Sequence, residues 1–306
     1  MATHEILLFY KYVDIADPHL LMREQRALCE RLGLTGRMIL ATEGINATLE
    51  GLKDNTDAYC EVMKADPRFS DIHFKKSDGT GKAFPRLSIK VRKDIVSNSF
   101  GELVKVDPRT TTGKRLSPEE LHEWFQKKPD SFYIIDMRND YEFRVGRFKN
   151  SLHPGLKNFR DLPQKLEEIA HLKDKVVLPV CTGGVRCEKA SGYLVQQGFK
   201  DVYQLDGGIV SYMEKYPGQD FEGGLYVFDN RHVMHFDDPA THKAIGTCDL
   251  CGASSESYVD CHLNTCHQHF ICCEECQKGQ GELIFCSEKC RTTHHATEGA
   301  KKTLAS

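Results

Sequence analysis

A chain of 306 residues is too long for one ordinary domain, so we expect two or three. Its net charge of −3 excludes a globally basic nucleic-acid-binding protein, so any such site must be a local patch. No apolar run approaches the roughly 20 residues of a membrane span and no signal peptide is apparent, so we expect a cytoplasmic protein.

Residues 1–95 alternate between predicted strands and helices. We expect strands at ILLFYKYV, GRMILA, NATLEG, DIHFKKS and LSIKVRK, and amphipathic helices at PHLLMREQRALCERLG and DNTDAYCEVMKAD. The β-α-β-β-α-β order is typical of a ferredoxin-like α+β domain. Cys29 and Cys60 lie within the two helices, where we interpret them as packed side chains.

The middle of the chain has the pattern of an α/β domain. Residues 96–116 contain turn formers and little periodicity, which predicts a linker. A helix then begins at SPEELHEWFQKK, where Ser117 and Glu120 have capping-box spacing. Buried strands at SFYIIDMR and DKVVLPVC alternate with helices at LPQKLEEIAHLK and KASGYLVQQGF. Residues 117–221 should therefore form a domain with a parallel sheet.

The loop CTGGVR places Cys181 at the carboxyl end of a predicted parallel strand, where open α/β sheets bind ligands. Gly183 and Gly184 permit a sharp turn whose N–H groups point inward, and the next helix adds the positive end of its dipole. Arg186 adds a cation, so the loop favours a nucleophilic Cys181 thiolate. The predicted anion cradle consists of Thr182, Gly183, Gly184 and Val185.

Two cysteines of this loop have alternative interpretations. Cys181 as a buried structural residue would leave the coincidence of glycines, arginine and helix start unexplained. Cys187 is either a thiol that resolves an oxidised or sulfurated Cys181, or a packed residue at the helix start. We predict Cys181, Arg186 and Cys187 as the catalytic residues.

Three segments resemble rhodanese domains: YIIDMRNDYEFRVGRFKNS, CTGGVR and VYQLDGGIVSY. The six-residue loop from Cys181 to Arg186 matches that of sulfurtransferase rhodaneses, in which the cysteine carries a persulfide. An N-terminal domain with TEGINATLEG, a loop CTGGVRCEKAS and a cysteine-rich tail occur together in the rhodanese-domain tRNA uridine(34) hydroxylases, formerly the UPF0176 proteins. The chain is identified as a member of this family.

The resemblance implies a function that the residues alone do not. Family members hydroxylate position 5 of the wobble uridine U34 in the tRNA anticodon loop to 5-hydroxyuridine, with molecular oxygen as co-substrate. Cys181 would either add to C6 of the uracil or carry a persulfide. The N-terminal domain is similar to the acylphosphatase fold but lacks the arginine-bearing glycine loop expected after its first strand.

Two other functions are weighed against this one. A sulfurtransferase that moves sulfane sulfur from thiosulfate to a thiol through a Cys181 persulfide needs neither the N-terminal domain nor the tail. A zinc-dependent interaction scaffold with a vestigial loop is disfavoured by the intact residues from Cys181 to Arg186.

Residues 222–306 form a predicted cysteine-rich module, with nine of the thirteen cysteines between Cys248 and Cys290. In a reducing compartment such clustering indicates metal rather than disulfides. Four successive pairs predict two structural zinc ions; interleaved pairing is one arrangement, and an iron–sulfur cluster is the alternative. Either Cys272 or Cys273 could pair with Cys276, and Cys273 has the better spacing. The predicted ligands are Cys248, Cys251, Cys261, Cys266, Cys273, Cys276, Cys286 and Cys290.

A basic stretch lies between His73 and Lys93, with seven basic residues, one acid, and Phe74 and Phe84 among them. It could contact RNA phosphates while an aromatic ring stacks on a base, and a solvated strand face is the alternative. The predicted RNA contacts are Lys75, Lys76, Arg86 and Lys90. Because neighbours on a strand point to opposite faces, Lys75 and Lys76 cannot both be central to one surface.

Overall fold

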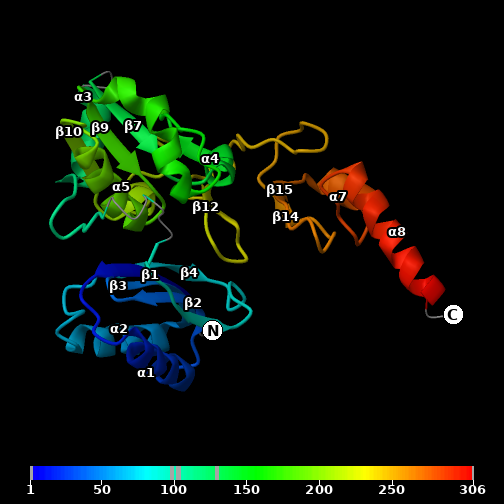
Figure 1. Cartoon of the computed structure of the whole chain (residues 1–306), viewed down its shortest axis with the longest axis horizontal. Helices are drawn as coiled ribbons and strands as arrows, with labels where there is room; N and C mark the ends of the chain where they lie inside the picture. Colours follow the sequence, from blue (N-terminus) through cyan, green and yellow to red (C-terminus); the bar gives the residue numbers. More distant parts are fainter. Residues whose placement is uncertain (1–2, 97–99, 101–104, 128–130, 305–306) are drawn as a thin grey trace. The chain divides into compact units, whose positions relative to one another are not determined.

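The computed structural model describes residues 3–96, 100, 105–127 and 131–304 (Figure 1). They form two compact units. The first contains 1–140, 150–217 and 228–231, and the second contains 141–149, 218–227 and 232–306. Part of the expected linker, 97–99 and 101–104, lies outside the described residues. The division of the chain at residues 95, 116 and 221 stays a prediction.

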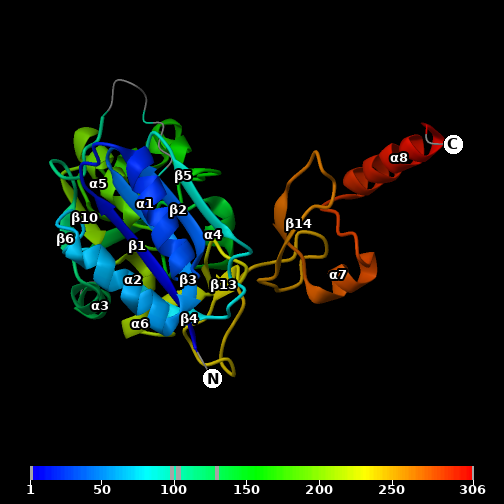
Figure 2. The same cartoon turned by 90° about the horizontal axis from the view of Figure 1, so that it is seen from below.

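The N-terminal part of the first unit has the expected ferredoxin-like topology, with the fifth of the predicted strands added at one edge of the sheet. Its elements are β1 (His4–Tyr12), α1 (Pro18–Arg31), β2 (Thr35–Ala41), β3 (Gly44–Leu52), α2 (Lys53–Ala65), β4 (Lys75–Gly79) and β5 (Leu87–Val91). The strand order is β4-β1-β3-β2-β5, and only the β2–β5 pair is parallel. Figure 2 shows α1 and α2 covering one face of this sheet.

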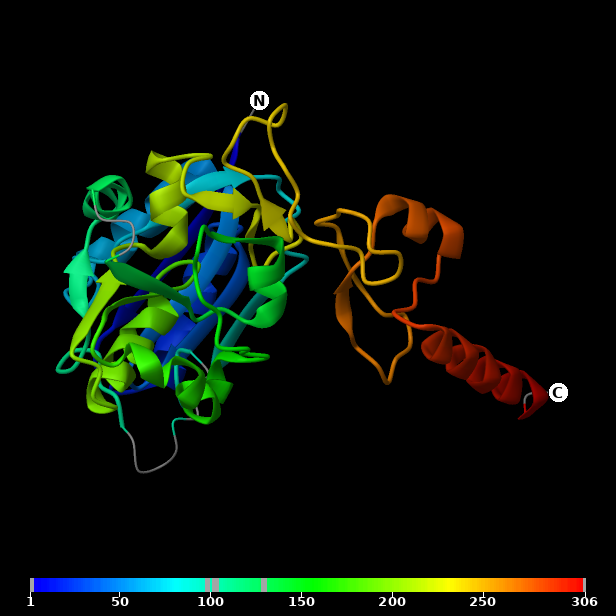
Figure 3. The ribbon, with the colours of Figure 1, turned by 90° about the horizontal axis from the view of Figure 1, so that it is seen from above.

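Side chains along β1 alternate between two faces of the sheet. One face packs against α1 and α2, and the other faces the second half of the unit. Leu7 and Phe9 are fully buried in the core that includes residues of α1 and α2. Leu8, Tyr10 and Tyr12 point to the opposite face, because successive side chains on a strand alternate. That face meets the second half of the unit, which lies in front of the sheet in Figure 3.

The second half of the first unit is the expected α/β domain. Its elements are β6 (Lys114–Leu116), α3 (Pro118–Lys127), β7 (Phe132–Asp136), η1 (Phe159–Leu172), β9 (Val176–Val180), α5 (Val185–Gln196), β10 (Asp201–Leu205) and α6 (Gly208–Lys215). The sheet order is β6-β10-β9-β7 and all its pairs are parallel. The capping box is present, since Ser117 and Glu120 exchange side-chain-to-backbone hydrogen bonds of 2.8 and 3.2 Å.

Two local expectations differ from the structure. The end of the expected linker is strand β6, because Lys114–Leu116 pairs with Tyr203–Leu205 of β10. The expected α-helix over LPQKLEEIAHLK is the 3₁₀ helix η1, which contains Pro163. Proline cannot donate a backbone hydrogen bond, and its ring disfavours the interior of an α-helix.

The second unit has little regular structure. Its elements are α4 (Asp140–Val145), β8 (Gly146–Phe148), β11 (Phe221–Gly223), β12 (Leu225–Tyr226), β13 (Val233–Met234), β14 (Tyr258–Asp260), β15 (His269–Ile271), α7 (Glu274–Gln280) and α8 (Glu288–Leu304). One small core contains Phe270, Phe285 and several cysteines, so thiols fill space that apolar side chains would occupy in a larger domain. Within the described ranges, no helix has the length and apolarity needed to cross a membrane.

Candidate active site

The loop at Cys181 connects β9 to α5 and is covered by the N-terminal sheet. Gly184, the residue before α5, has a φ of 98°, a conformation that favours glycine. A Cβ atom on Gly183 would lie 3.0 Å from Leu8, and one on Gly184 would lie 3.0 Å from the Tyr10 hydroxyl. Both glycines therefore also permit the close approach of β1.

Cys181 is fully buried, and its surroundings favour the thiolate. Burial by itself raises the pKa of a thiol, but three influences outweigh it here. The Cys187 thiol donates a hydrogen bond, the Arg186 guanidinium lies nearby, and the backbone N–H groups of Cys187 and Arg186 point at the sulfur. Together they lower the pKa of Cys181 to about 6, so the group is ionised at neutral pH. The structure thus places the loop residues selected from the sequence around the Cys181 sulfur, and their catalytic role stays a prediction.

Cys187 behaves in the opposite way. It is 2% exposed, and burial followed by its hydrogen bond to Cys181 raises its pKa well above the usual value for a thiol. Cys187 is therefore a protonated donor beside a thiolate. This geometry brings the two sulfurs together, while the catalytic role of Cys187 stays a prediction.

Arg186 is held inside the domain rather than exposed. Its guanidinium donates to the Thr182 hydroxyl across 3.4 Å and lies 5.8 Å from the centre of the Phe228 ring. At the end of the neighbouring strand β7, Asp136 and Arg138 form a fully buried ion pair of 2.6 Å. The predicted loop residues therefore lie close together. The Arg186 guanidinium is buried in the protein, near the Cys181 thiolate.

Two residues of α5 that sequence reasoning missed bind the N-terminal domain. Glu188 accepts hydrogen bonds from the Tyr10 hydroxyl at 2.9 Å and from Arg115 at 2.8 Å. Lys189 is 2% exposed and forms ion pairs with Glu43 at 2.7 Å and with Asp94 at 3.1 Å. Glu188 and Lys189 of the stretch CEKAS, and Glu43 of TEGI, thus form contacts between the two domains. The sequence shows these charged residues but does not show which residues they contact.

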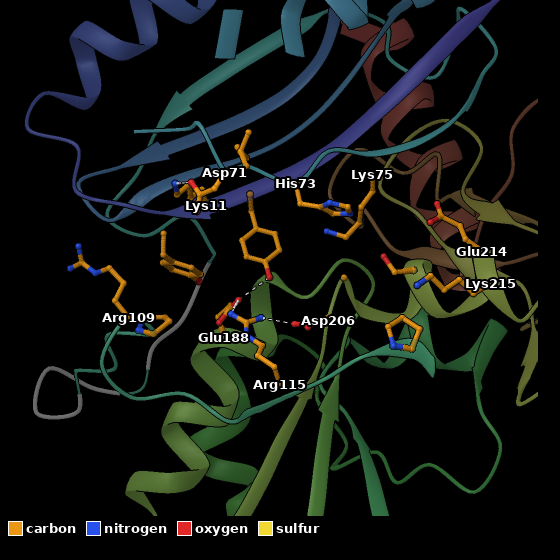
Figure 4. Close-up of a pocket in the computed structure, with 17 residues that line it drawn as sticks. Lys11, Asp71, His73, Lys75, Arg109, Arg115, Glu188, Asp206, Glu214 and Lys215 are labelled. Carbon is orange, nitrogen blue, oxygen red and sulfur yellow. Dashed lines mark hydrogen bonds and ion pairs between the residues drawn. The ribbon is translucent and has the colours of Figure 1, made fainter. Parts of the chain in front are cut away.

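A cavity of about 660 Å³ lies between the N-terminal sheet and the α/β domain (Figure 4). Tyr10, His73 and Lys75 line it from the N-terminal side, and Glu188 and Glu214 line it from the other side. The volume is within the about 300–1,000 Å³ that is usual for small-molecule sites. Cys181 is not among the lining residues, so the cavity approaches the loop without reaching the sulfur.

Eight cysteines of the second unit gather into two groups of four, each with its sulfurs within 4.8 Å of one another. The groups are Cys248, Cys251, Cys273, Cys276 and Cys261, Cys266, Cys286, Cys290. The first and third pairs share one group, so the pairing is interleaved. Sγ–Sγ distances of 3.6 Å, as between Cys251 and Cys273, are close to the roughly 3.8 Å expected around a tetrahedral zinc ion. Cys272 is buried and stands outside both groups.

Matches to known protein families extend over almost the whole chain. Residues 4–95 match the UPF0176 acylphosphatase like domain, 117–215 the rhodanese-like domain, and 222–291 the rhodanase C-terminal family. Proteins named tRNA uridine(34) hydroxylase from Cytophaga hutchinsonii and Bacillus pumilus are 44% and 40% identical to it. Each match covers 95% of this chain, and 91% and 89% of the respective relatives.

The chain belongs to the tRNA uridine(34) hydroxylase family.

In this member of the family, the expected basic patch does not form one surface. Strands β4 and β5 lie at opposite edges of the N-terminal sheet, with β1, β3 and β2 between them. Lys75 is buried, and Lys76 forms ion pairs with Glu5 and Asp57. Arg86 and Lys90, near and on β5, are exposed and make no ion pair with a described residue.

The aromatic residues of the same stretch pack against the cores of the N-terminal domain. Phe84 is 4% exposed. Phe74 packs edge-on against Phe9 of the core, with ring centres 4.8 Å apart. Phe84 therefore supplies core area, whereas Phe74 is half-buried and its stacking on a base stays a prediction.

The second unit also contains a histidine cluster that sequence reasoning did not select. His235, Asp237 and His242 have potential ligand atoms close together. Both ring nitrogens of His242 are already engaged, Nδ1 with Asp237 at 2.9 Å and Nε2 with Glu256 at 2.9 Å. These hydrogen bonds raise the pKa of His242 against the effect of burial, and they account for the cluster without a metal.

Proposed function

We propose that this protein hydroxylates C5 of uridine 34 in tRNA to give 5-hydroxyuridine, with molecular oxygen as co-substrate. The observation that carries the proposal is the buried Cys181 thiolate beneath the N-terminal domain, in a chain 44% identical to a protein named for this activity. A tRNA substrate would place the reaction in the cytoplasm.

The roles that we propose follow from the chemistry of the loop. A Cys181 thiolate can add to C6 of uracil and make C5 nucleophilic, and a Cys181 persulfide is the other possible reactive form. Arg186 and the loop from Thr182 to Val185 hold the negative charge on sulfur. Cys187 supplies a thiol proton beside it. One oxygen atom enters at C5 and the other leaves as water, with two electrons and two protons from an external reductant. Loss of the C5 proton then expels the Cys181 thiolate from C6 and restores the C5–C6 double bond.

The sulfurtransferase alternative is not favoured. A small donor such as thiosulfate needs open access to the cysteine, whereas Leu8 and Tyr10 of the N-terminal domain lie against the loop and Cys181 is fully buried. The cover is better suited to a large substrate whose binding energy can displace it.

We also propose two structural zinc ions, one in each group of four cysteines. The all-thiolate ligand sets suit zinc, which is four-coordinate in structural sites. The backbone N–H of Cys273 points at the Cys248 sulfur at 3.3 Å, and that of Cys286 points at the Cys261 sulfur at 3.5 Å. Such N–H···S contacts stabilise thiolate charge around a bound cation.

The experiment is nucleoside analysis of tRNA from a strain that lacks its own U34 hydroxylase genes. Expression of this chain should restore 5-hydroxyuridine, and the Cys181→Ser variant should not, because an alcohol of high pKa cannot replace the thiolate. Absence of 5-hydroxyuridine with the well-expressed wild-type chain would refute the proposed activity. Full restoration by Cys181→Ser would refute the role of the thiolate.

A further inference from the structure

Lys75 is a buried lysine with no ionised partner among the residues that the structure describes. Its residue is 6% exposed, and its ammonium makes no hydrogen bond or ion pair with any residue that the structure describes. Its closest aromatic contact is the Tyr10 ring, whose centre lies 5.2 Å from Nζ. Burying an unpaired ammonium costs free energy, so stability does not explain this lysine. The group instead lines the cavity, where a ligand could be its partner.

The strand register places Lys75 on the face that meets the Cys181 loop. Lys75 lies directly opposite Leu8 in the antiparallel β1–β4 pair, so both side chains share one face. Leu8 contacts the position of Gly183 from that face. The Cε atom of Lys75 would lie 3.4 Å from a Cβ on Gly207, which precedes α6. Lys75 therefore lies between the cavity and the loop.

Most other charged side chains of the cavity already have partners within the chain. The pairs are Lys11 with Asp71, Arg109 with Asp14, Arg115 with Glu188 and Asp206, and Lys215 with Glu119. Glu214 of α6 lines the cavity opposite Lys75 and forms no ion pair with it or with another described residue (Figure 4). Lys75 and Glu214 are thus the lysine and the carboxylate of the cavity that form no ion pair with a described residue.

We propose that this cavity receives the extruded uracil of the substrate tRNA, with Lys75 donating to the O4 carbonyl and Glu214 accepting the N3–H. This inference rests on the proposed function and names how its site selects the base. Uracil presents an acceptor beside a donor on this edge, whereas cytosine presents an amino donor beside the N3 acceptor. The edge is free only in an unpaired base that has left the stack.

The same contact assists the reaction. When the Cys181 sulfur bonds to C6, the π pair of the C5–C6 double bond moves towards C4 and negative charge collects on O4. An ammonium beside O4 stabilises that charge. The bonding of sulfur to C6 is an addition, so no group leaves the base. Since Cys181 is fully buried, the base must displace the side chains that cover the loop, which are Leu8 and Tyr10, while Lys75 stays in contact with O4.

The protonation state of Lys75 predicts a pH dependence of base recognition. Burial lowers its pKa to about 8, against the influence of the Cys181 thiolate and of Glu214, Glu188 and Asp206. His73 and Tyr10 also face it from the N-terminal side. The ammonium is lost as pH rises through about 8, so the preference for uracil should weaken above that pH. Arginine stays charged there.

The experiment measures binding of two anticodon stem-loop RNAs that differ only in U34 or C34. The wild-type protein should prefer U34 by roughly 5- to 100-fold, the range of a well-placed pair of base contacts. Lys75→Met and Glu214→Gln should each bring the ratio close to one and leave C34 binding unchanged. Lys75→Arg should keep a preference that no longer weakens above pH 8. Lys200→Met, which removes an exposed lysine paired with Asp174, is the matched control.

Unfolding measurements separate recognition from a structural role. Lys75→Met removes a buried charge, so its midpoint of unfolding should equal or exceed that of the wild type. An equal preference for U34 in wild type and Lys75→Met, or no preference in the wild type, would overturn the inference. The proposed function is tested separately by 5-hydroxyuridine in cells: its absence with the wild type would leave the binding ratio as evidence for the base site alone.

Discussion

Lys189 of α5 lies 2.7 Å from the carboxylate of Glu43, an ion pair that joins the helix after the Cys181 loop to the β2–β3 turn. Asp94 completes the contact at 3.1 Å from the same ammonium. The lysine is almost fully buried, and each carboxylate is 23% exposed. Because α5 also supplies the N–H groups that face Cys181, a contact that fixes this helix against the N-terminal domain also fixes the cover of the thiolate.

We predict that Lys189→Met destabilises the protein by about 3 kcal/mol, because removing one partner of a buried pair leaves the others desolvated and unpaired. Chemical denaturation measures this. The variant should also expose Cys181, so its alkylation by iodoacetamide should become faster. Lys200→Met, which breaks an ion pair with both side chains about three-quarters exposed, should cost at most about 1 kcal/mol. Equal costs for the two variants would contradict the role of Lys189.

The second prediction concerns the charge on Cys181. Its pKa of about 6 means that the thiolate is lost as pH falls through 6, and single-turnover activity should fall with it. Arg186→Ala removes a nearby cation and should raise this pKa by roughly one unit. Arg186→Lys keeps a charge and should raise it less. Thiolate absorbance in the ultraviolet, taken as the difference from Cys181→Ser, follows the titration without substrate. An unchanged pKa in Arg186→Ala would remove Arg186 from the site.

The geometry of the loop at Cys181 was predictable from sequence because its residues are close together in the chain. The segment from Cys181 to Arg186 contains its own glycines, its cation and its helix start, and short-range geometry then brings backbone N–H groups to the sulfur. The interleaved cysteine groups were one of several pairings, since spacing alone does not say which pairs share a metal.

The contacts between domains were not predictable in this way. Tyr10 and Glu188 are separated by 178 positions, and neither residue signals the other. The prediction that the basic stretch forms one surface failed for a related reason. Strands β4 and β5 follow one another in the chain, but they lie at opposite edges of the sheet. The sequence therefore predicts Lys75 as a surface lysine. Its pairing with Leu8 shows that its side chain lies on the sheet face that meets the α/β domain.

The third prediction concerns metal in the second unit. Purified protein should contain about two zinc ions per chain by elemental analysis, one for each group of four thiolates. Cys273→Ser should lower the content by about one ion and destabilise the unit, because a small module depends on its metal for folding free energy. Cys272→Ala is the matched control: it changes the neighbouring cysteine, which belongs to neither group, and should retain both ions. Loss of zinc from both variants alike would contradict the assignment of Cys273.

The last prediction divides the basic stretch into its two edges. Arg86 and Lys90 are exposed beside or on β5 and lack ion partners among the described residues, so each is available to a phosphate. Lys76 at the β4 edge is already neutralised by Glu5, 2.9 Å away, and by Asp57. Each phosphate contact releases counterions, so tRNA affinity should fall with salt. The double variant Arg86→Gln, Lys90→Gln should flatten the log–log slope by roughly one to two units.

Lys76→Gln is the control for this measurement, because it removes a charge from the same stretch that is already paired within the protein. Its salt dependence should match the wild type. If the double variant also keeps the wild-type slope, the β5 edge is a solvated face and the phosphate contacts lie elsewhere on the protein. If Lys76→Gln alone flattens the slope, RNA must break the ion pairs with Glu5 and Asp57, and the β4 edge, next to the Lys75 cavity, carries the backbone of the bound strand.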